Sequence, residues 1–453
     1  MTEHATDGAP TRLTGWGRAG WSSARVSAAA DVDGVVAAVR AARAAGPGGR
    51  GILARGLGRS YGDAAMNGGG RVLDLAGLTG IGAIGDDGVV EVAAGVSIGD
   101  LIAHAVPRGW FVPVTPGTRH VTVGGALAAD VHGKNHHRDG SLGAHVVSLA
   151  LVDGLGEVRE LTAGDPLLGA VIGGMGLAGV VVGARLRLVP VETASITVHT
   201  RRTTDLDATM GALAEDDRAF RYTVAWLDTQ VGGRAAGRGV LTSGDHSPAG
   251  EPGALPLDAH RTPRPLPGPP WAPSGLVNRL TARAFDEAWF RKAPARPTVG
   301  PATLSTFFHP LDVVDGWNRV YGRRGFVQYQ LAVADGAVVE AVLALFRRER
   351  VSTFLPVLKR FGPSSGAPLS FPTEGWTLAV DIPATSDLAP VHDRADDLVV
   401  AAGGRCYLAK DARVRPELLP VMYPGLDEWR ELRARLDPDD VFASDLSRRL
   451  SLC

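Results

Sequence analysis

Three short segments hold side chains of the kinds that acid–base, metal or sugar chemistry uses. The run from His132 to His137 reads HGKNHH and contains three histidines. That density suggests a metal site, but no cysteine lies nearby and no HExxH helix frames the histidines, so we predict no metal ligand here. Lys359 and Lys410 are ordinary surface charges unless they are buried. A buried lysine has a lowered pKa and can act as a base.

Two glutamines lie on a strand predicted over residues 326–333. Side chains alternate along a strand, so Gln328 and Gln330 point to the same face. Two amides on one face can bind the hydroxyl groups of a sugar. The pattern alone favours the simpler interpretation, an exposed polar face.

Three glycine-rich clusters precede apolar strands in the first half of the chain. The first, ARGLGRSYGD over residues 54–63, exposes successive backbone N–H groups that suit a pyrophosphate, with Arg55 and Arg59 to match its charge. It is not a GxGxxG fingerprint on a βαβ unit, which argues against a Rossmann domain. One such cluster describes a surface turn equally well. Together with PGTRHVTVGG over 116–125 and GGMGLAG over 173–179, it predicts an extended nucleotide lying along bare backbone.

The elements that would position these segments form two units. The first 190 residues or so combine short strands with helices near 31–46 and 97–106, an α+β pattern. Residues 195–243 and 326–382 both read as strand, helix, strand, strand. This weak repeat predicts a second domain built on one large sheet with helices on one face.

A proline-rich stretch separates the two copies of the repeat. It covers about residues 244–300 and includes the run Pro263–Pro270. A connection of this length and composition is either functional or mobile, and we predict an irregular, mobile surface loop.

Composition excludes several classes of function. Lys and Arg number 47 and Asp and Glu 48, a balance that argues against binding nucleic acid through a basic face. Cys406 and Cys453 make no disulfide framework, so they do not indicate a redox compartment. The amino-terminal residues carry no signal-peptide pattern, and no apolar run approaches the roughly 20 residues of a spanning helix. Contact with either face of a membrane stays open.

Taken together, the segments resemble the vanillyl-alcohol oxidase/p-cresol methylhydroxylase superfamily of FAD enzymes, in order across nearly the whole chain. The HGKNHH and FVQYQ blocks are the specific part of the resemblance, whereas the glycine turns alone are not. The matching segments are TRLTGWGR, ARGLGRSYGD, PGTRHVTVGGALAADVHGKNHH, GGMGLAGVV, GFVQYQ, APLSFP, GWTLAVDIP, YLAKD and DPDDVFASDLSRRL.

The resemblance implies an α+β, two-domain vanillyl-alcohol oxidase-like flavoprotein. A discontinuous FAD-binding domain would comprise residues 1–194 and 406–453, and a substrate domain with a large antiparallel sheet, 195–405, would cover the flavin. FAD would be held non-covalently, because Arg59 stands where covalent members often carry histidine. The FAD-lining residues that it implies are Ala54, Arg55, Gly56, Leu57, Gly58, Arg59, Ser60, Tyr61, Gly62, Asp63, Ala64, Gly117, Thr118, Thr122, Val123, Gly124, Gly125, Ala129, Asp130, Val131, His132, Val181 and Tyr407.

The implied reaction is oxidation of the 2′-hydroxyl of a ribose carried on decaprenyl phosphate, the first half of an epimerisation that leads to cell-wall arabinan. A base takes the hydroxyl proton and the C2′ hydride passes to the flavin, giving a 2′-keto sugar. Lys410 is the candidate base or orienting group, and His132 positions the sugar. The substrate contacts that the resemblance implies are Tyr61, Lys134, Phe308, Gln328, Gln330, Lys359, Thr377, Ala379 and Lys410.

The chain departs from its relatives at two of these positions. Ala379 stands where some members have a cysteine, so a thiol-dependent covalent inhibitor finds no nucleophile there. Thr377 holds a place where an asparagine is familiar, which changes the expected fine contacts to substrate. Cys406 is interpreted as a buried apolar filler and not as a reactive thiol.

The implied partners are the polyprenyl-phosphate sugar, an NAD(P)H-dependent keto-sugar reductase as partner subunit, and a membrane surface. The last would be contacted by the proline-rich loop together with Trp271, Leu276, Trp289 and Phe290. One alternative is an alditol or aldonolactone oxidase acting on a soluble sugar. Another is a flavin- or metal-binding module without turnover. The electron acceptor, prenyl length and oligomeric state are not indicated by the sequence.

Overall fold

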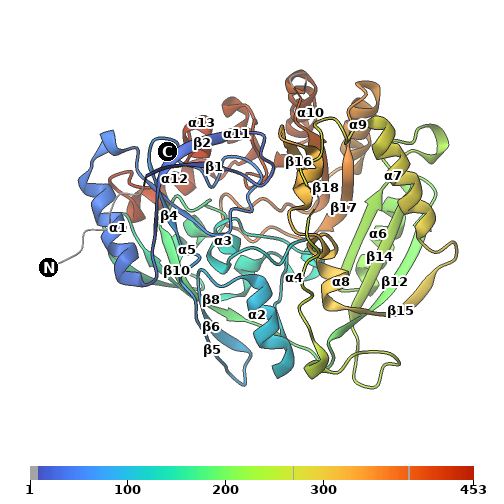
Figure 1. Cartoon of the computed structure of the whole chain (residues 1–453), viewed down its shortest axis with the longest axis horizontal. Coiled ribbons are helices and arrows are strands. Elements are labelled where there is room, and N and C mark those ends of the chain that lie inside the picture. Colours follow the sequence, from blue (N-terminus) through green and yellow to red (C-terminus); the bar gives the residue numbers. More distant parts are fainter. Residues whose placement is uncertain (1–8, 269, 386–387) are drawn as a thin grey trace.

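The amino-terminal part of the chain folds around two sheets on one side of the molecule (Figure 1). This computed structural model describes residues 9–268, 270–385 and 388–453; residues 1–8 of the predicted FAD domain and Pro269 of the proline-rich run lie outside the described residues. One sheet has the order β1-β2-β4-β3 and the other, antiparallel, β5-β6-β10-β8-β9, while β7 pairs with β11. The strands are β1 (Pro10–Thr14), β2 (Trp21–Ala28), β3 (Ile52–Arg55), β4 (Arg71–Asp74), β5 (Ile81–Ile84), β6 (Val89–Ala93), β7 (Trp110–Phe111), β8 (Val146–Val152), β9 (Val158–Thr162), β10 (Val180–Arg187) and β11 (Val189–Pro190).

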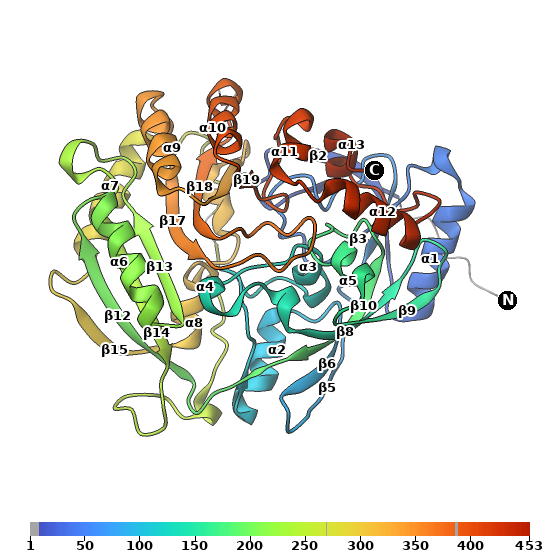
Figure 2. The ribbon, with the colours of Figure 1, turned by 180° about the vertical axis from the view of Figure 1, so that it is seen from behind.

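Helices from both ends of the chain surround these sheets (Figure 2). The indole N–H of Trp429 in α12 donates to the carbonyl of Ala170 in α5 at 3.0 Å, so the carboxyl-terminal segment packs back against the amino-terminal part. No helix among the described residues is long and apolar enough to cross a bilayer. The helices here are α1 (Val32–Ala44), α2 (Ile98–Ala105), α3 (Val123–Ala128), α4 (His136–Asp139), α5 (Pro166–Val171), α11 (Leu419–Met422), α12 (Leu426–Leu436) and α13 (Asp445–Leu450).

An eight-stranded antiparallel sheet forms the other part of the molecule, with the strand order β15-β12-β14-β13-β17-β18-β16-β19. The predicted two-part α+β architecture with one large antiparallel sheet is confirmed. The domain boundaries stay predictions, and the one at residue 405 falls within β19. The strands are β12 (Ser195–Thr203), β13 (Tyr222–Leu227), β14 (Gly239–His246), β15 (Thr298–Thr303), β16 (Phe326–Val333), β17 (Phe354–Phe361), β18 (Gly375–Pro383) and β19 (Arg405–Cys406).

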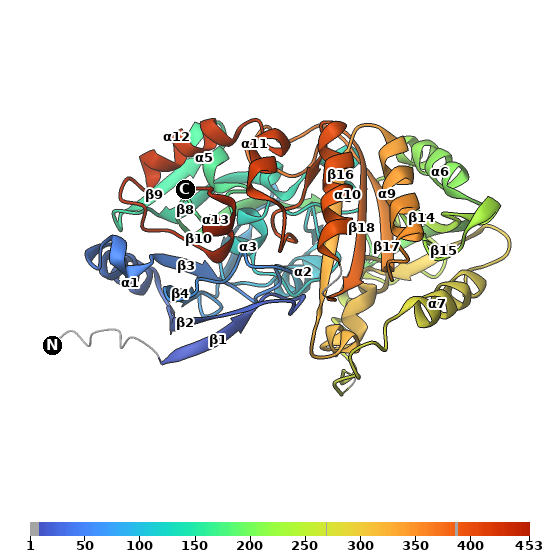
Figure 3. The same cartoon turned by 90° about the horizontal axis from the view of Figure 1, so that it is seen from above.

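Helices cover both faces of this sheet, and not one face only (Figure 3). Arg201 on β12 donates to Asp216 of α6 at 2.5 Å, whereas Arg202 donates to the carbonyl of Ala293 at the end of α7. Adjacent residues of a strand point to opposite faces, so α6 and α7 lie on opposite sides. Helices α9 and α10 pack beside each other against β16, β18 and β19. The helices are α6 (Leu206–Ala219), α7 (Arg279–Lys292), α8 (Leu304–Phe308), α9 (Gly336–Arg348) and α10 (Ala389–Ala401).

The prediction of an irregular loop over residues 244–300 is wrong for its second half, which contains α7 and the start of β15. Asn278 begins α7 with a capping box, because its side chain accepts the N–H of Thr281 while the Thr281 hydroxyl accepts the N–H of Asn278. The proline run is also attached, since the N–H of Leu266 donates to the carbonyl of Val313 at 2.8 Å. The sequence hides α7 because few of its positions are buried, which weakens the apolar stripe.

Strand alternation on β16 turns polar side chains toward the amino-terminal part. Tyr329 faces the helices and stacks on His392 of α10 with ring centroids 5.6 Å apart. Its neighbours Gln328 and Gln330 therefore point to the opposite face. Gln330 meets His132 there, so this face of the sheet lies over the HGKNHH segment.

Candidate active site

The first glycine turn follows β3 and is wedged between the start of α3 and the loop 407–412. A Cβ on Gly56 would lie 2.2 Å from the Thr122 hydroxyl, and one on Gly62 would lie 1.8 Å from the carbonyl oxygen of Asp411. The N–H of Tyr61 donates to the carbonyl of Ala409 at 2.9 Å. Both glycines are required, because the Thr122 side chain leaves no room for a Cβ at Gly56 and the backbone of Asp411 leaves none at Gly62.

Unpaired amides line the same turn. Among the described residues, the N–H groups of residues 57–60 and of Gly117 and Thr118 donate no hydrogen bond to the chain. Gly117 and Gly125 are exposed, and a Cβ on Gly117 would meet nothing within 4 Å. Because buried or half-buried amides need acceptors, a run of free N–H groups beside open backbone fits the pyrophosphate of a dinucleotide. These segments could therefore hold FAD.

The two arginines of the turn have different environments. Arg55 donates to the carbonyls of Thr14 and Ala65, at 2.9 and 2.5 Å, so it braces the turn and is not the free cation that the sequence predicted. Arg59 lies over the ring of Trp16 at 4.0 Å, and its buried Nε has no partner among the described residues. Arg59 thus keeps its Nε donor for a ligand, whereas both terminal nitrogens of Arg55 donate to backbone carbonyls.

The other residues predicted to line FAD belong to three adjoining segments. Tyr407 donates its hydroxyl proton to the carbonyl of Ala129 at 2.7 Å, which ties the carboxyl-terminal loop to the end of α3. Asp130, next in the chain, has φ 40° and accepts hydrogen bonds from Gly143 and Ser370. α3 packs on β10, which carries Val181. The remaining members are Ala54, Leu57, Gly58, Ser60, Asp63, Ala64, Val123, Gly124 and Val131.

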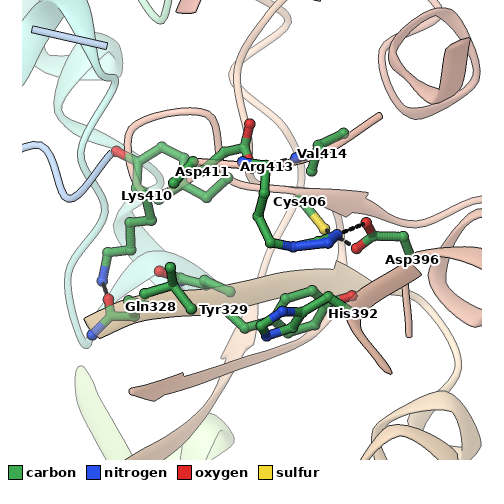
Figure 4. Close-up of a pocket in the computed structure, with 13 residues that line it drawn as sticks. Gln328, Tyr329, His392, Asp396, Cys406, Lys410, Asp411, Arg413 and Val414 are labelled. Atoms are coloured by element: carbon green, nitrogen blue, oxygen red, sulfur yellow. Dashed lines mark hydrogen bonds and ion pairs between the residues drawn. The ribbon is translucent and has the colours of Figure 1, made fainter. Parts of the chain in front are cut away.

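Lys410 reaches the substrate face of the sheet from the carboxyl-terminal loop. Its Nζ donates to Oε1 of Gln328 (Figure 4). The same Nζ lies 4.9 Å from the ring centroid of Tyr61. All three side chains are partly exposed, and the place where they meet is referred to as the opening. Farther along this loop, Arg413 turns the other way, toward Asp396 at 2.6 Å behind β16. The pocket in Figure 4 lies mostly behind β16, on the side of the sheet that α10 covers, and is distinct from the opening.

Two further amines line the opening from different elements. Lys359 on β17 donates to the carbonyl of Gly133 at 3.4 Å, and Lys134 donates to the carbonyl of Phe307 and lies 4.0 Å from its ring centroid. Both lysines are partly exposed. Phe308 was predicted to shape this pocket, but its ring is buried against Phe111 and Tyr222. Its neighbour Phe307 holds Lys134 instead.

Burial brings the pKa values of the three amines close to neutrality. Removal from water lowers the pKa of Lys134 to about 7. Burial, together with the nearby Lys410 and Lys134, lowers that of Lys359 to about 7. Burial lowers the pKa of Lys410 to about 8, against the opposing effect of the Asp381 carboxylate. Near pH 8 Lys410 therefore exists as both amine and ammonium, and it can accept a proton.

His132 is buried beneath the amines and is held by the sheet. Nε2 of Gln330 lies 3.0 Å from Nε2 of His132 and also donates to the Thr377 hydroxyl at 3.1 Å. The amide N–H must donate to the ring nitrogen, which leaves the imidazole proton on Nδ1. That Nδ1 has no partner among the described residues. Burial and the nearby Lys359, His136 and Lys410 hold the pKa of His132 well below its usual value, so the ring is neutral and its Nδ1 donor is unused.

The other two histidines of HGKNHH have separate partners. His136 Nδ1 accepts the N–H of Gly362 at 3.2 Å, and His137 Nε2 lies 3.0 Å from the carbonyl of Phe220. No group of three or more His, Cys, Asp or Glu side chains within the described ranges could hold a metal ion. Cys406 is buried, as predicted, and burial raises its pKa.

Ala379 pairs with Gln330 across the strands and is partly exposed on the same face. A pocket-directed thiol-reactive inhibitor is expected to form no adduct at this position, because alanine offers no nucleophile. The substitution A379C should create one. Mass mapping of labelled peptides checks both results and separates this site from the exposed Cys453. An adduct at position 379 of the unaltered chain would contradict the assignment.

Three residues of the site were missed by sequence reasoning. Asp381 accepts from Gln328 and from the Tyr321 hydroxyl, the latter at 2.9 Å. Arg449 of α13 bridges Asp63 in the glycine turn and Asp411 beside Lys410. Asp381 could have been found, because it continues the alternation through Thr377 and Ala379. Tyr321 and Arg449 lie in segments without periodic pattern.

FAD is expected to dissociate on denaturation, because the guanidinium of Arg59 forms no covalent bond to a flavin. Heating the yellow protein and removing the precipitate should leave all of the colour in the supernatant. Flavin absorbance that stays with the washed precipitate would refute non-covalent binding. Thin-layer chromatography of the supernatant distinguishes FAD from other flavins.

Comparison with known proteins agrees with this geometry. A model of the FAD binding domain matches residues 23–162, and a model of D-arabinono-1,4-lactone oxidase matches residues 333–450. The decaprenylphosphoryl-beta-D-ribose oxidase of Mycolicibacterium smegmatis is 44% identical over 97% of each chain. The L-gulono-1,4-lactone dehydrogenase of Mycobacterium tuberculosis is 25% identical over 88% of this chain and 90% of its own. The alditol oxidase of a Streptomyces species is 22% identical over 80% of each.

The glycine turn 54–63 and the segment around Gly117 and Gly125, here called the glycine cradle, both lie within the residues that match the FAD binding domain. The similarity to the first relative extends through both parts of the fold. The chain is an FAD-dependent oxidoreductase and belongs to the decaprenylphosphoryl-beta-D-ribose oxidase family.

Proposed function

We propose that this chain oxidises the 2′-hydroxyl of decaprenylphosphoryl-β-D-ribose to the 2′-keto sugar. The observation that carries the proposal is the convergence of Lys410, Gln328 and His132, from three distant segments, beside the glycine cradle. The relative that is 44% identical is named for this substrate.

FAD, when bound, supplies the acceptor for the C2′ hydride. Lys410 is the group that takes the hydroxyl proton, because its pKa of about 8 leaves a usable fraction as the neutral amine. His132 donates its Nδ1 proton to a sugar oxygen, and Gln330 fixes the ring that presents it. Tyr61 limits the opening on the side of the glycine turn.

Lys134 and Lys359 provide the positive charge for the phosphate of the substrate. With pKa values of about 7 in the free protein, both amines are partly neutral at physiological pH. A bound phosphate would favour their charged forms and raise both values. Affinity for the lipid-linked sugar should therefore weaken as the pH rises above about 7.

Turnover with decaprenylphosphoryl ribose, compared with free ribose and with soluble alditols and aldonolactones, tests the proposal. We expect oxidation of the lipid-linked sugar and a 2′-keto product by mass spectrometry. Oxidation of the soluble sugars alone would instead support an alditol or aldonolactone oxidase. The lactone-oxidase match and the gulonolactone relative favour that alternative. A neutral polyol would still need Lys410 as the base, but it carries no charge for Lys134 and Lys359 to bind.

The 2′-keto sugar is a substrate for a reductase, and we propose that an NAD(P)H-dependent keto-sugar reductase consumes it. Returning a hydride to the opposite face of C2′ completes an epimerisation to the arabinose form. Adding such a reductase with NADH should convert the accumulated keto product to the arabinose epimer.

We also propose that the protein contacts a membrane surface through the segment 266–292. Leu266, Leu276 and Leu280 are 61%, 46% and 78% exposed, and Trp289 of α7 is 40% exposed. The exposed face of α7 also carries basic side chains, including Arg279 and Lys292. An amphipathic, basic surface of this kind suits anionic lipid headgroups.

Two aromatic residues of the predicted membrane contact each have one ring face covered by an arginine, which leaves less of the ring to contact lipid. Phe290 lies under the guanidinium of Arg238 at 4.3 Å, and Trp271 under that of Arg18 at 4.1 Å. Cosedimentation with phosphatidylglycerol vesicles should fall for L280D relative to the unaltered chain, while V158D, at an exposed apolar site on β9, should not change it. Equal loss in both variants would refute the segment as the contact.

A further inference from the structure

One buried carboxylate lies directly behind the base. Asp381 on β18 stands opposite Gln328 on β16 in the strand register, so both side chains point to the substrate face. Its side chain is 1% exposed. One oxygen accepts from Nε2 of Gln328 and the other accepts the Tyr321 hydroxyl proton at 2.9 Å. Asp381 therefore reaches substrate only through its neighbours.

The carboxylate decides which way the Gln328 amide points. An ionised carboxylate only accepts hydrogen bonds, so the NH₂ end of Gln328 must face Asp381. The carbonyl end then faces Lys410, whose ammonium can only donate. An uncharged amide at position 381 would remove this preference, because it could bond either end of Gln328.

We propose that Asp381 is a positioning residue that acts on Lys410 through Gln328, fixing the amide and supplying the negative charge that balances the base. This rests on the proposed function, in which Lys410 takes the hydroxyl proton. One chain of hydrogen bonds joins four separate elements, running from Lys410 through Gln328 and Asp381 to Tyr321.

The charges around Lys410 make this balance important. Lys359 on β17 faces it, His132 lies below, Tyr61 packs against its Nζ from the glycine turn, and Tyr321 closes the far end. Burial raises the pKa of Tyr61 and Tyr321 well above their ordinary value, so both are neutral. Arg59 adds further positive charge beside Tyr61. Asp381, whose pKa burial raises to about 6, is still ionised at the pH where Lys410 titrates.

The test is the pH dependence of flavin reduction by decaprenylphosphoryl ribose in the D381N holoenzyme. In the unaltered enzyme the rate of flavin reduction should rise with pH along a limb centred near pH 8, and this limb should disappear in K410A. In D381N the limb should move to lower pH by about one unit, because the charge that favours the ammonium is gone. The plateau, which is the limiting rate at a pH above the limb, should fall about tenfold in D381N because the Gln328 amide is no longer held in one orientation. Y321F keeps the carboxylate, so its limb should stay in place.

A limb at the same pH in D381N and in the unaltered enzyme overturns the inference. If D381N fails to retain flavin, D381E is the deciding variant, because it keeps the negative charge but shifts the carboxylate. We expect D381E to show a limb at the same pH and a lowered plateau. A plateau equal to that of the unaltered enzyme overturns the inference. Failure of the proposed function is distinguishable, because the unaltered enzyme would then show no reduction by this substrate at any pH.

Discussion

Replacing Lys410 by alanine is expected to leave the flavin spectrum unchanged and to slow its bleaching by substrate by at least about a hundredfold, the scale of general base catalysis. Lys410 contacts Gln328 and Tyr61 at the opening and has a pKa of about 8, so its loss removes the proposed proton acceptor. Anaerobic stopped-flow absorbance measures the rate directly.

Lys292 provides the matched control for that experiment. It is an exposed lysine in the last turn of α7, which ends beside Arg202 of β12, and K292A should bleach at the rate of the unaltered enzyme with detergent-solubilised substrate. Equal rates of flavin bleaching in K410A and K292A would show that Lys410 takes no part in the reaction. Loss of flavin from K410A would show instead that the loop 407–412 depends on its lysine for structure.

Replacing Gly62 by alanine should nearly abolish FAD binding. The added Cβ would lie 1.8 Å from the carbonyl oxygen of Asp411, so the glycine turn and the loop carrying Lys410 must separate. Overpacking of this kind costs about 1–3 kcal/mol of folding stability, and backbone on both sides gives little room to relax. Flavin content after purification and thermal unfolding of the flavin-free protein measure the two effects.

The control for that substitution is Gly211 in α6, which is exposed and where a Cβ meets nothing within 4 Å. G211A should keep full flavin content and raise the stability slightly, because glycine is unfavourable inside a helix by about 0.5–1 kcal/mol. Normal flavin content in G62A would show that the turn and the loop can part without harm to the cradle.

Much of the site could be predicted because local patterns and resemblance agreed. Alternation on β16 put Gln328 and Gln330 on one face, and the structure brings Gln330 to His132 and Gln328 to Lys410. The glycine turn was recognised from its spacing, and its free amides fit that interpretation. These features depend on residues close together in the chain.

The errors fall where distant contacts decide the role of a side chain. Arg55 was expected to meet phosphate, but the carbonyls of Thr14 and Ala65 occupy it. Phe307 and Phe308 differ by one position, and only the packing of α8 determines which one meets Lys134. α7 begins at a capping box whose second partner is threonine, not the usual glutamate or glutamine, and its exposed apolar residues obscured the helical period. Neither the Arg55 contacts nor the contact of Phe307 with Lys134 leaves a local signature in the sequence.

The central claim is that this chain holds FAD against a sugar whose hydroxyl Lys410 deprotonates. Anaerobic mixing of the yellow protein with one equivalent of decaprenylphosphoryl ribose, followed at the visible flavin band, tests it most directly. The account predicts bleaching of the bound flavin, one 2′-keto sugar formed per flavin, and recovery of the band when an electron acceptor is admitted. A flavin band that persists under these conditions, with the ribose recovered unchanged, would contradict it.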